Sequence, residues 1–403
     1  MISNQTLQQA TRLQSKENHF VSIRLSIIII LLIVAIQSVS SQVTILWNYN
    51  NLSYLKSHQN SYRSLISDIM SKGDRHANSA PLSITSKPNI FVKDTHYYAS
   101  LAIYYWPDPN NSSNAYIHRD GNINPEYKQY DAGKLEQLSD RMKYLSLAYY
   151  FTGDNIYLKS YLRQLDVWFL SKDTYMYPRF DYAQIAPGHN GNRGRPYGLI
   201  EAYNFNTILE SIRLIDSLSG INSKRMKALR KWFRKFGDWM EKDPLGKEER
   251  STLNNHSIAY DVLLLNIRLF SDNKLDESII NNFYPIRLSR QVMSDGSQPH
   301  ELNRPRAMHY SVYNLSHIID FYTIMNHFDS SYFESSQPLL TKAFTFLLQY
   351  DKPIELFPYK ENASSWSEER ANLRFEYGRF TRLGNKTTTG DRLYTIIDEV
   401  LFQ

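Results

Sequence analysis

The chain has 403 residues, of which 42% are hydrophobic and 21% charged, and it carries a formal net charge of +6. This composition excludes disordered and repetitive fibrous proteins, because it supplies the apolar surface of a large core. The densest basic stretch, Lys224 to Lys235, alternates with apolar residues at helical spacing. We interpret it as an amphipathic helix with a solvated basic face, and we expect no nucleic-acid partner.

An unbroken apolar run, 26–36, follows Arg24 near the start of the chain. The run is too short to cross a bilayer, and Val39 and Ser41 occupy the small-residue positions before a signal-peptidase cut. We therefore predict that residues 1–41 are a signal peptide and that the mature protein is secreted, without stable membrane association. An uncleaved signal anchor is the alternative.

Glycosylation sequons agree with export. They start at Asn51, Asn111, Asn314, Asn362 and Asn385. The chain has no cysteine, so a secreted form must be stabilised by its core rather than by disulfides.

After a polar lead-in segment, residues 42–88, apolar residues recur at intervals of three and four along most of the chain. The first such helix contains Leu135, Leu138 and Met142 and ends at Gly153. Further helices are expected at 156–169, 205–215, 224–240, 257–270, 279–283, 306–328, 338–350 and 391–402. Successive helix pairs without strand–helix alternation predict an all-α fold, in which α/α hairpins wind into a toroid. Because no Gly/Pro-rich linker interrupts it, residues 89–403 are expected to form one catalytic domain, and the protein is expected to be a monomer.

Two long connecting regions, 101–125 and 176–195, are rich in Tyr, Trp, Arg and Asn. Long ordered loops of this kind are common places for binding residues, and tyrosine and tryptophan rings commonly line sugar-binding sites. The alternative is that both loops only pack on the helix ends.

Several familiar catalytic signatures are missing. The chain has no cysteine nucleophile, no His-Glu-x-x-His zinc motif, no Gly-x-Ser-x-Gly elbow, no phosphate-binding glycine loop and no dinucleotide fingerprint. We therefore expect neither a metal nor an organic cofactor.

Two groups of polar residues remain as candidates for chemistry. Asn255 and His256 follow Asn254 at the start of the helix predicted at 257–270, where they serve either as a helix cap or in catalysis. Arg306, Tyr310 and Tyr313 stand at i, i+4 and i+7, on one face of the helix predicted at 306–328. That face is either a packed cation–π stack or part of a site.

Together these residue types suit the elimination of a 4-linked uronic acid. Such a reaction removes the proton on C5, next to a carboxylate, so the carboxylate charge must be neutralised by Arg, amide and imidazole donors. A tyrosine serves as the base when a nearby cation lowers its pKa, and its phenol then returns a proton to the leaving oxygen.

The chain resembles the alginate lyase domain family in ordered motifs between about residues 90 and 325. They are LAIYYWPDP from Leu101, YIHRDGNINPE from Tyr116, LAYYFTG from Leu147, WF from Trp168, AQIAPG from Ala183, NNH from Asn254, DGSQP from Asp295, and Arg306 followed by YSVYNL from Tyr310. The resemblance implies an incomplete α/α toroid and a secreted enzyme that cleaves an acidic polysaccharide by β-elimination.

The resemblance also implies roles for single residues. It assigns the Asn–His pair to Asn255 and His256, the neutralising arginine to Arg306, and the catalytic tyrosine to Tyr310, with Tyr313 as the alternative. Because a glycan on the sequon of Asn255 would block catalysis, Asn255 is expected to be unmodified.

Candidates for sugar and carboxylate binding come from the two long loops. They are Tyr104, Trp106, Arg119 and Gln184. The sequence does not rank alginate, polymannuronate, glucuronan or other polymers, and it does not distinguish endo from exo action.

Two other classes of function remain open from the sequence. One is a glycoside hydrolase on the same kind of toroid, with Asp261 and Glu301 as acid and base. The other is a polyuronate-binding surface protein without activity.

Overall fold

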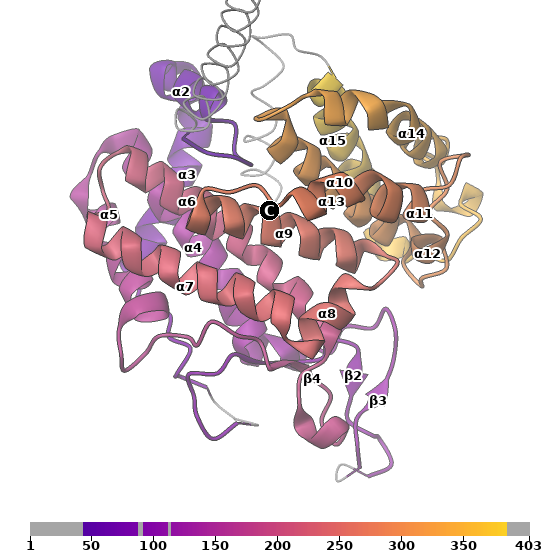
Figure 1. Cartoon of the computed structure of the whole chain (residues 1–403), viewed down its shortest axis with the longest axis horizontal. Helices are drawn as coiled ribbons and strands as arrows, with labels where there is room; N and C mark the ends of the chain where they lie inside the picture. Colours follow the sequence, from indigo (N-terminus) through magenta and orange to yellow (C-terminus); the bar gives the residue numbers. More distant parts are fainter. Residues whose placement is uncertain (1–42, 88–91, 112–113, 385–403) are drawn as a thin grey trace, which may run out of the picture. The chain divides into compact units, whose positions relative to one another are not determined.

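The computed structural model describes residues 43–87, 92–111 and 114–384. The prediction of an all-α fold is confirmed, because helices dominate the described residues (Figure 1). The helices are α2 (Tyr49–Ser57), α3 (Arg63–Ala77), α4 (Asp131–Thr152), α5 (Asn155–Leu165), α6 (Phe205–Ser217), α7 (Ser223–Lys242), α8 (Pro244–Arg250), α9 (Asn255–Asp272), α10 (Glu277–Asn282), α11 (Ser289–Gln291), α12 (Pro299–Leu302), α13 (Ala307–Asn326), α14 (Ser331–Leu348) and α15 (Trp366–Gly384). The predicted signal peptide, the predicted helix at 391–402 and the sequon of Asn385 lie outside the described residues.

Helices α4, α6, α9 and α13 form the inner part of the helical array. Most of their residues are buried, and each packs against the next in this order. Helices α3 and α5 cover α4, helix α7 covers α9, and α14 and α15 cover α13. A helix that is apolar on most faces must be surrounded by other segments. Helices α9 and α13 are of this kind, and their first turns lie against neighbouring segments.

Helix α7 confirms the interpretation of the basic stretch. Met226, Leu229, Trp232 and Phe236 are buried, whereas the lysines between them are exposed. The positive charges therefore lie on a solvated face, and the apolar stripe packs on α9.

Helix α14 begins earlier than the sequence predicts. A start at Pro338 fits the preference of proline for first turns, yet the helix starts at Ser331 with Pro338 inside it. The early turns are held by Phe333, which is buried, and by Ser336, whose hydroxyl bonds the Tyr322 hydroxyl. Tertiary contacts therefore outweigh the cost of an internal proline.

The lead-in segment carries α2 and α3 and contributes to the core. Before α2, the backbone N–H groups of Ile45 and Leu46 donate to the Glu210 carboxylate over 2.7 and 3.0 Å. His327 on the α13 side bonds the Ile45 carbonyl over 2.6 Å. These contacts attach the start of the described chain to α6 and to the end of α13.

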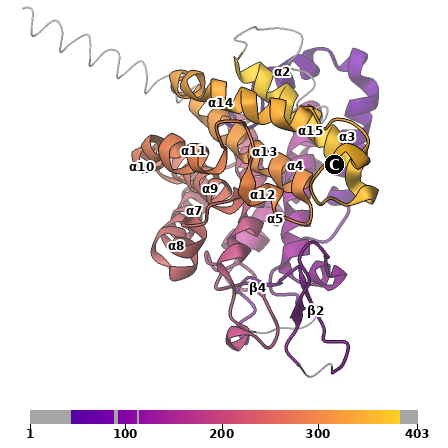
Figure 2. The same ribbon diagram turned by 90° about the vertical axis from the view of Figure 1, so that its right-hand side faces the viewer.

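A layer of short strands and loops lies at one end of the helices (Figure 1 and Figure 2). It contains β1 (Ala99–Leu101), β2 (Tyr105–Trp106), β3 (Ile117–His118) and β4 (Tyr182–Ile185). Strand β1 pairs with β4 in parallel, and β2 pairs with β3 in an antiparallel hairpin. We call these strands, together with the connecting segments 102–111, 114–125 and 176–198, the loop layer. The sequence predicts this region only as two long loops.

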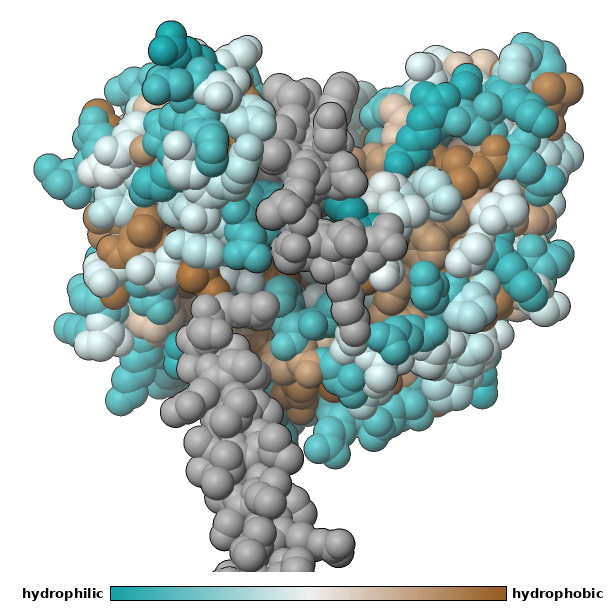
Figure 3. Space-filling view, turned by 90° about the horizontal axis from the view of Figure 1, so that it is seen from above, coloured by the Kyte–Doolittle hydropathy of each residue, from teal (hydrophilic) through white to brown (hydrophobic). Residues whose placement is uncertain are grey.

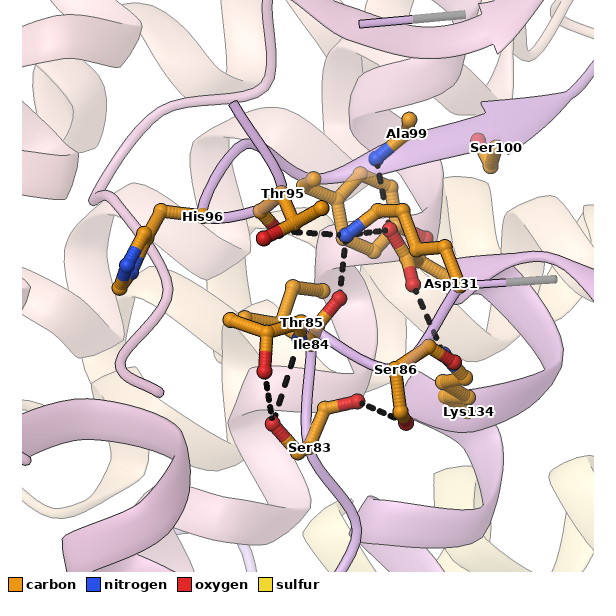
Figure 4. A network of polar contacts seen from close by, with 12 residues as sticks. Ser83, Ile84, Thr85, Ser86, Thr95, His96, Ala99, Ser100, Asp131 and Lys134 are labelled. Carbon is orange, nitrogen blue, oxygen red and sulfur yellow. Dashed lines mark hydrogen bonds and ion pairs between the residues drawn. The ribbon is translucent and has the colours of Figure 1, made fainter. Parts of the chain in front are cut away.

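A buried ion pair fixes the start of β1 (Figure 4). Asp131, the first residue of α4, accepts a hydrogen bond from the Ala99 N–H over 2.9 Å and pairs with Lys87 over 2.8 Å. Lys87 also donates to the Thr95 carbonyl over 2.8 Å. Burial lowers the pKa of Lys87, and the charge of Asp131 opposes this shift. The pair thus joins the loop layer to the helical array.

The face drawn in Figure 3 is largely polar, with apolar side chains in separate small areas. Within the described ranges, every helix is too short or too polar to cross a membrane. Of the predicted sequons, Asn51 and Asn314 are buried, while Asn111 and Asn362 are exposed. Glycosylation at the exposed pair stays a prediction.

Candidate active site

His256 lies in the first turn of α9, next to the end of α8. The side chain of Asn254 caps the helix by accepting a hydrogen bond from the His256 N–H. The Nδ1 atom of His256 lies 2.6 Å from a carboxylate oxygen of Glu249, which is 1% exposed. A buried carboxylate favours the proton on Nδ1 and leaves Nε2 as the nitrogen available to a ligand. Glu249 is thus an orienting partner that the sequence does not reveal.

Asn255 is held by Glu301 from α12. Its backbone N–H and its amide nitrogen donate to the Glu301 carboxylate over 2.7 to 3.0 Å. Asn255 is 1% exposed, so a glycan does not fit on its side chain in the folded protein. Burial raises the pKa of Glu301, and the hydrogen bonds from Asn255 oppose that rise.

Tyr310 lies in the first turn of α13 and meets the loop layer through Tyr104. Their hydroxyl groups share a hydrogen bond. The guanidinium carbon of Arg304 lies 3.8 Å from the centroid of the Tyr310 ring, and Arg304 also pairs with Asp120 over 3.1 Å. Burial raises the pKa of the Tyr310 phenol, Tyr104 adds to the rise, and Arg304 opposes it.

Arg306 does not share the face of Tyr310. It is the cap residue before α13, with φ −123° and ψ 67°, so the spacing of a helix does not apply to it. Its guanidinium donates to Glu369 on α15 over 2.6 Å and lies 3.9 Å from Glu361. The expected position of a guanidinium beside Tyr310 is occupied instead by Arg304, two residues earlier. The sequence places two arginines, Arg304 and Arg306, just before this helix. The residue at which the helix starts decides which of them lies beside Tyr310.

Tyr313 lies on the same helix, one turn further along. Its ring stands edge to face with His317, with centroids 4.2 Å apart. Burial raises the pKa of Tyr313, and Tyr104, Asp320 and Glu249 add to the rise in that order. Burial lowers the pKa of His317 to about 3, so that imidazole is neutral. Tyr310 thus has an arginine against its ring, and Tyr313 has a neutral imidazole.

The predicted binding residues lie in the loop layer. Trp106 follows Tyr104 on the hairpin, its indole N–H donates to the Asn122 carbonyl over 2.9 Å, and Arg119 lies 5.7 Å from its ring centroid. Gln184 is buried in β4 with φ 53°, at the bulge where three residue steps of β4 match two of β1. The structure therefore joins Tyr104 directly to Tyr310 and places Trp106 and Arg119 beside it. It gives Gln184 no hydrogen bond to either catalytic candidate within the described part of the chain.

The two carboxylates considered for hydrolysis are both engaged. Asp261 pairs with Arg287 over 2.6 Å and with Arg250 over 3.4 Å. Glu301 holds Asn255 as described above. Both are buried, and burial raises the pKa of each. The described residues also contain no group of three or more His, Asp or Glu side chains arranged to hold a metal ion.

Comparison with known proteins identifies relatives. The family model of alginate lyase matches residues 83–356. The crystal structure of an alginate lyase from Bacteroides ovatus superposes with a TM-score of 0.78 at 29% identity, covering 88% of this chain and 98% of that one. Alginate lyase A1-III from Sphingomonas species A1 aligns at 14% identity with a TM-score of 0.43, covering 81% and 92% of the two chains. No curated protein sequence matches the chain.

The fold and this match define a polysaccharide lyase built on an α/α toroid, as the sequence predicts. The family match covers well over half of the chain. The chain belongs to the alginate lyase family.

Proposed function

We propose that this enzyme cleaves a 4-linked uronic-acid polymer, of the alginate or glucuronan type, by metal-independent β-elimination. The observation that carries the proposal is the contact of Tyr310 with both Tyr104 and Arg304 at the start of α13. The relative from Bacteroides ovatus, an alginate lyase that this chain covers almost completely, supports the substrate class.

In the proposed reaction, Tyr310 removes the proton on C5 of the uronate. The electron pair of the C5–H bond forms a double bond between C4 and C5, and the bond from C4 to the glycosidic oxygen breaks. The phenol of Tyr310 then gives its proton to that oxygen, so one residue serves as base and acid. No water enters the products, and the new non-reducing end is unsaturated.

The negative charge of the carboxylate on the same sugar must be neutralised, because it otherwise keeps the C5 proton very weakly acidic. His256, oriented by Glu249, donates to it from Nε2 when protonated. The buried amide of Asn255 donates to Glu301, so Asn255 acts by holding the turn that carries His256. We assign the guanidinium of this group to Arg304 rather than to Arg306, because Arg306 is bound to Glu369 and Arg304 lies against Tyr310.

The state of Tyr310 sets the pH dependence. Its pKa is raised by burial, so the phenolate is a minor form near neutral pH. The charge of Arg304 stabilises the phenolate once it forms, whereas Tyr104 adds to the rise of the pKa. The ionisation of Tyr310 should therefore give the pH–rate profile a rising limb, and the loss of the donor proton from His256 should give it a falling limb at higher pH.

We further propose that the enzyme acts outside the cell after removal of residues 1–41, as a monomer. The apolar run after Arg24 and the small residues before the expected cut support export.

A screen of polymers tests the function. Purified mature protein is incubated with alginate, polymannuronate, glucuronan and hyaluronan, with and without a chelator, and the ultraviolet absorbance of unsaturated ends is followed. We expect absorbance to rise with at least one uronate polymer, equally in both conditions. New reducing ends without absorbance would indicate a hydrolase, and binding without new ends would indicate a non-catalytic binding protein.

A further inference from the structure

The segment 194–198 is held tightly against β4 by two glycines. The Gly194 N–H donates to the Asp181 carbonyl, and the Arg195 N–H donates to the Ala183 carbonyl, both over 2.9 Å. A Cβ on Gly194 would lie 2.7 Å from backbone atoms of β4, and one on Gly198 would lie 2.6 Å from Ala183. Such distances exclude larger side chains, so the segment between the glycines has a fixed position.

Arg195 projects from this segment into a stack of aromatic rings. Its guanidinium carbon lies 4.8 Å from the centroid of the Tyr105 ring and 5.2 Å from that of Tyr197. Within the described ranges, its guanidinium forms neither an ion pair nor a hydrogen bond. By contrast, Arg304 pairs with Asp120, and Arg306 pairs with Glu369. Arg195 is thus a positioned cation whose hydrogen-bond donors are uncommitted.

Each of the two rings that contact Arg195 is linked to a candidate catalytic residue. Tyr197 stands edge to face with His256, with ring centroids 5.3 Å apart. Tyr105 directly follows Tyr104, whose hydroxyl bonds Tyr310. Arg195 therefore lies beside the site, one aromatic ring away from the imidazole that receives the carboxylate of the reacting sugar.

Resting on the proposed function, we infer that Arg195 binds the carboxylate of the uronate residue next to the one that is cleaved. A guanidinium matches a carboxylate with two parallel hydrogen bonds, and stacking on tyrosine fixes the plane of the guanidinium without using its donors. Arg195 thereby makes the enzyme select chains in which the neighbouring sugar is also acidic. It acts in binding and does not take part in proton transfer.

The test measures binding without turnover. A mannuronate tetrasaccharide is titrated calorimetrically into the full-length mature protein carrying Tyr310→Phe, alone and combined with Arg195→Gln, Arg195→Lys or Arg193→Gln. Arg193 is the matched control, since it is an exposed arginine of the same loop. We expect Arg195→Gln to weaken binding by roughly tenfold or more, Arg195→Lys to weaken it less, and Arg193→Gln to change it less than about twofold.

Two results would overturn the inference. One is unchanged affinity after Arg195→Gln. The other is an equal loss after Arg193→Gln, which would show a general attraction between a basic loop and a polyanion. If Arg195→Gln fails to fold, the comparison of Arg195→Lys with Arg193→Gln decides in the same way.

Kinetics on polymannuronate with Tyr310 intact separate this inference from the proposed function. Arg195→Gln should raise KM and leave kcat within about twofold, because the residue binds a sugar that does not react. A wild-type protein that forms no unsaturated product would contradict the proposed function, whereas the calorimetric result would still decide on Arg195.

Discussion

The helical array and the loop layer position their functional side chains by different means. In the array, His256 and Tyr310 stand in the first turns of α9 and α13, two helices buried on most faces. In the loop layer, Tyr104 and Arg195 are positioned by glycine contacts, ion pairs and short strands. We propose that the array carries the chemistry and that the loop layer carries substrate selection. Variants in the array should therefore change kcat. Variants in the loop layer should change KM, and variants at the junction between the two regions should change the free energy of unfolding.

Loss of the phenol at Tyr310 should have the largest effect. Tyr310→Phe removes the proposed base and acid, and we expect kcat to fall by about a thousandfold or more with the fold intact. The matched variant Tyr313→Phe, one turn along the same helix, should retain substantial activity. Initial rates of unsaturated product and circular dichroism check both variants. An inactive Tyr313→Phe beside an active Tyr310→Phe would assign the base to Tyr313 instead.

The pair Arg304 and Arg306 should separate catalysis from packing. Arg304→Gln should lower kcat by about a hundredfold. Because Arg304 opposes the raised pKa of Tyr310, its loss should also move the rising limb of the pH–rate profile to higher pH. Full pH–rate profiles of the wild type and both variants provide the measurement.

Arg306→Gln should instead lower the free energy of unfolding by about 1–3 kcal/mol, because it leaves the buried Glu369 with His309 alone as its partner. Its kcat should change little. The assignment would be wrong if Arg306→Gln abolished turnover in a stable protein while Arg304→Gln remained active.

The buried ion pair tests the junction between the two regions. Lys87→Met leaves the buried Asp131 with Lys134, 3.6 Å away, as its cation, so we expect a loss of about 3 kcal/mol in the free energy of unfolding, measured with denaturant. Lys93→Met, an exposed change in the same connection, should have almost no effect. A loss of the same size in both variants would place the effect outside the pair.

Glu249 should show the smallest catalytic effect. Glu249→Gln keeps a hydrogen-bond acceptor for His256 but removes the charge, so we expect kcat to fall by about tenfold. The neighbouring exposed change Glu248→Gln is the control and should have wild-type rates. Identical kinetics for the two variants would show that Glu249 does not orient the imidazole.

The helices were predictable because apolar periodicity reports burial directly. The roles of Asn255, His256 and Tyr310 were inferred from their place at helix starts and from family motifs, and these roles stay predictions. The contact of Arg304 with Tyr310 was not predicted. The family resemblance assigned the arginine to Arg306, and the helical spacing that supported it extended one residue beyond the helix start at Ala307. The partners Glu249, Glu369 and Asp120 depend on segments that meet only in the folded chain, and sequence spacing carries no record of such contacts.

The short strands and close glycine contacts of the loop layer explain why its structure was harder to predict than that of the helices. Strands β1 and β4 have three and four residues, too few for an alternating pattern to be recognised. Glycines 194 and 198 are recognisable as clamps only when the backbone of β4 lies beside them. The loop layer was therefore predicted as a place for binding residues but not as a structure.

The most direct test of the account is the fate of water in the reaction. Wild-type enzyme is allowed to cleave the preferred uronate polymer in water enriched in heavy oxygen, and the products are weighed by mass spectrometry, with Tyr310→Phe run in parallel. Elimination by Tyr310 predicts unsaturated products without heavy oxygen from the wild type and no products from the variant. Products with saturated non-reducing ends, heavier by one water than unsaturated ones, or undiminished cleavage by the variant, would contradict it.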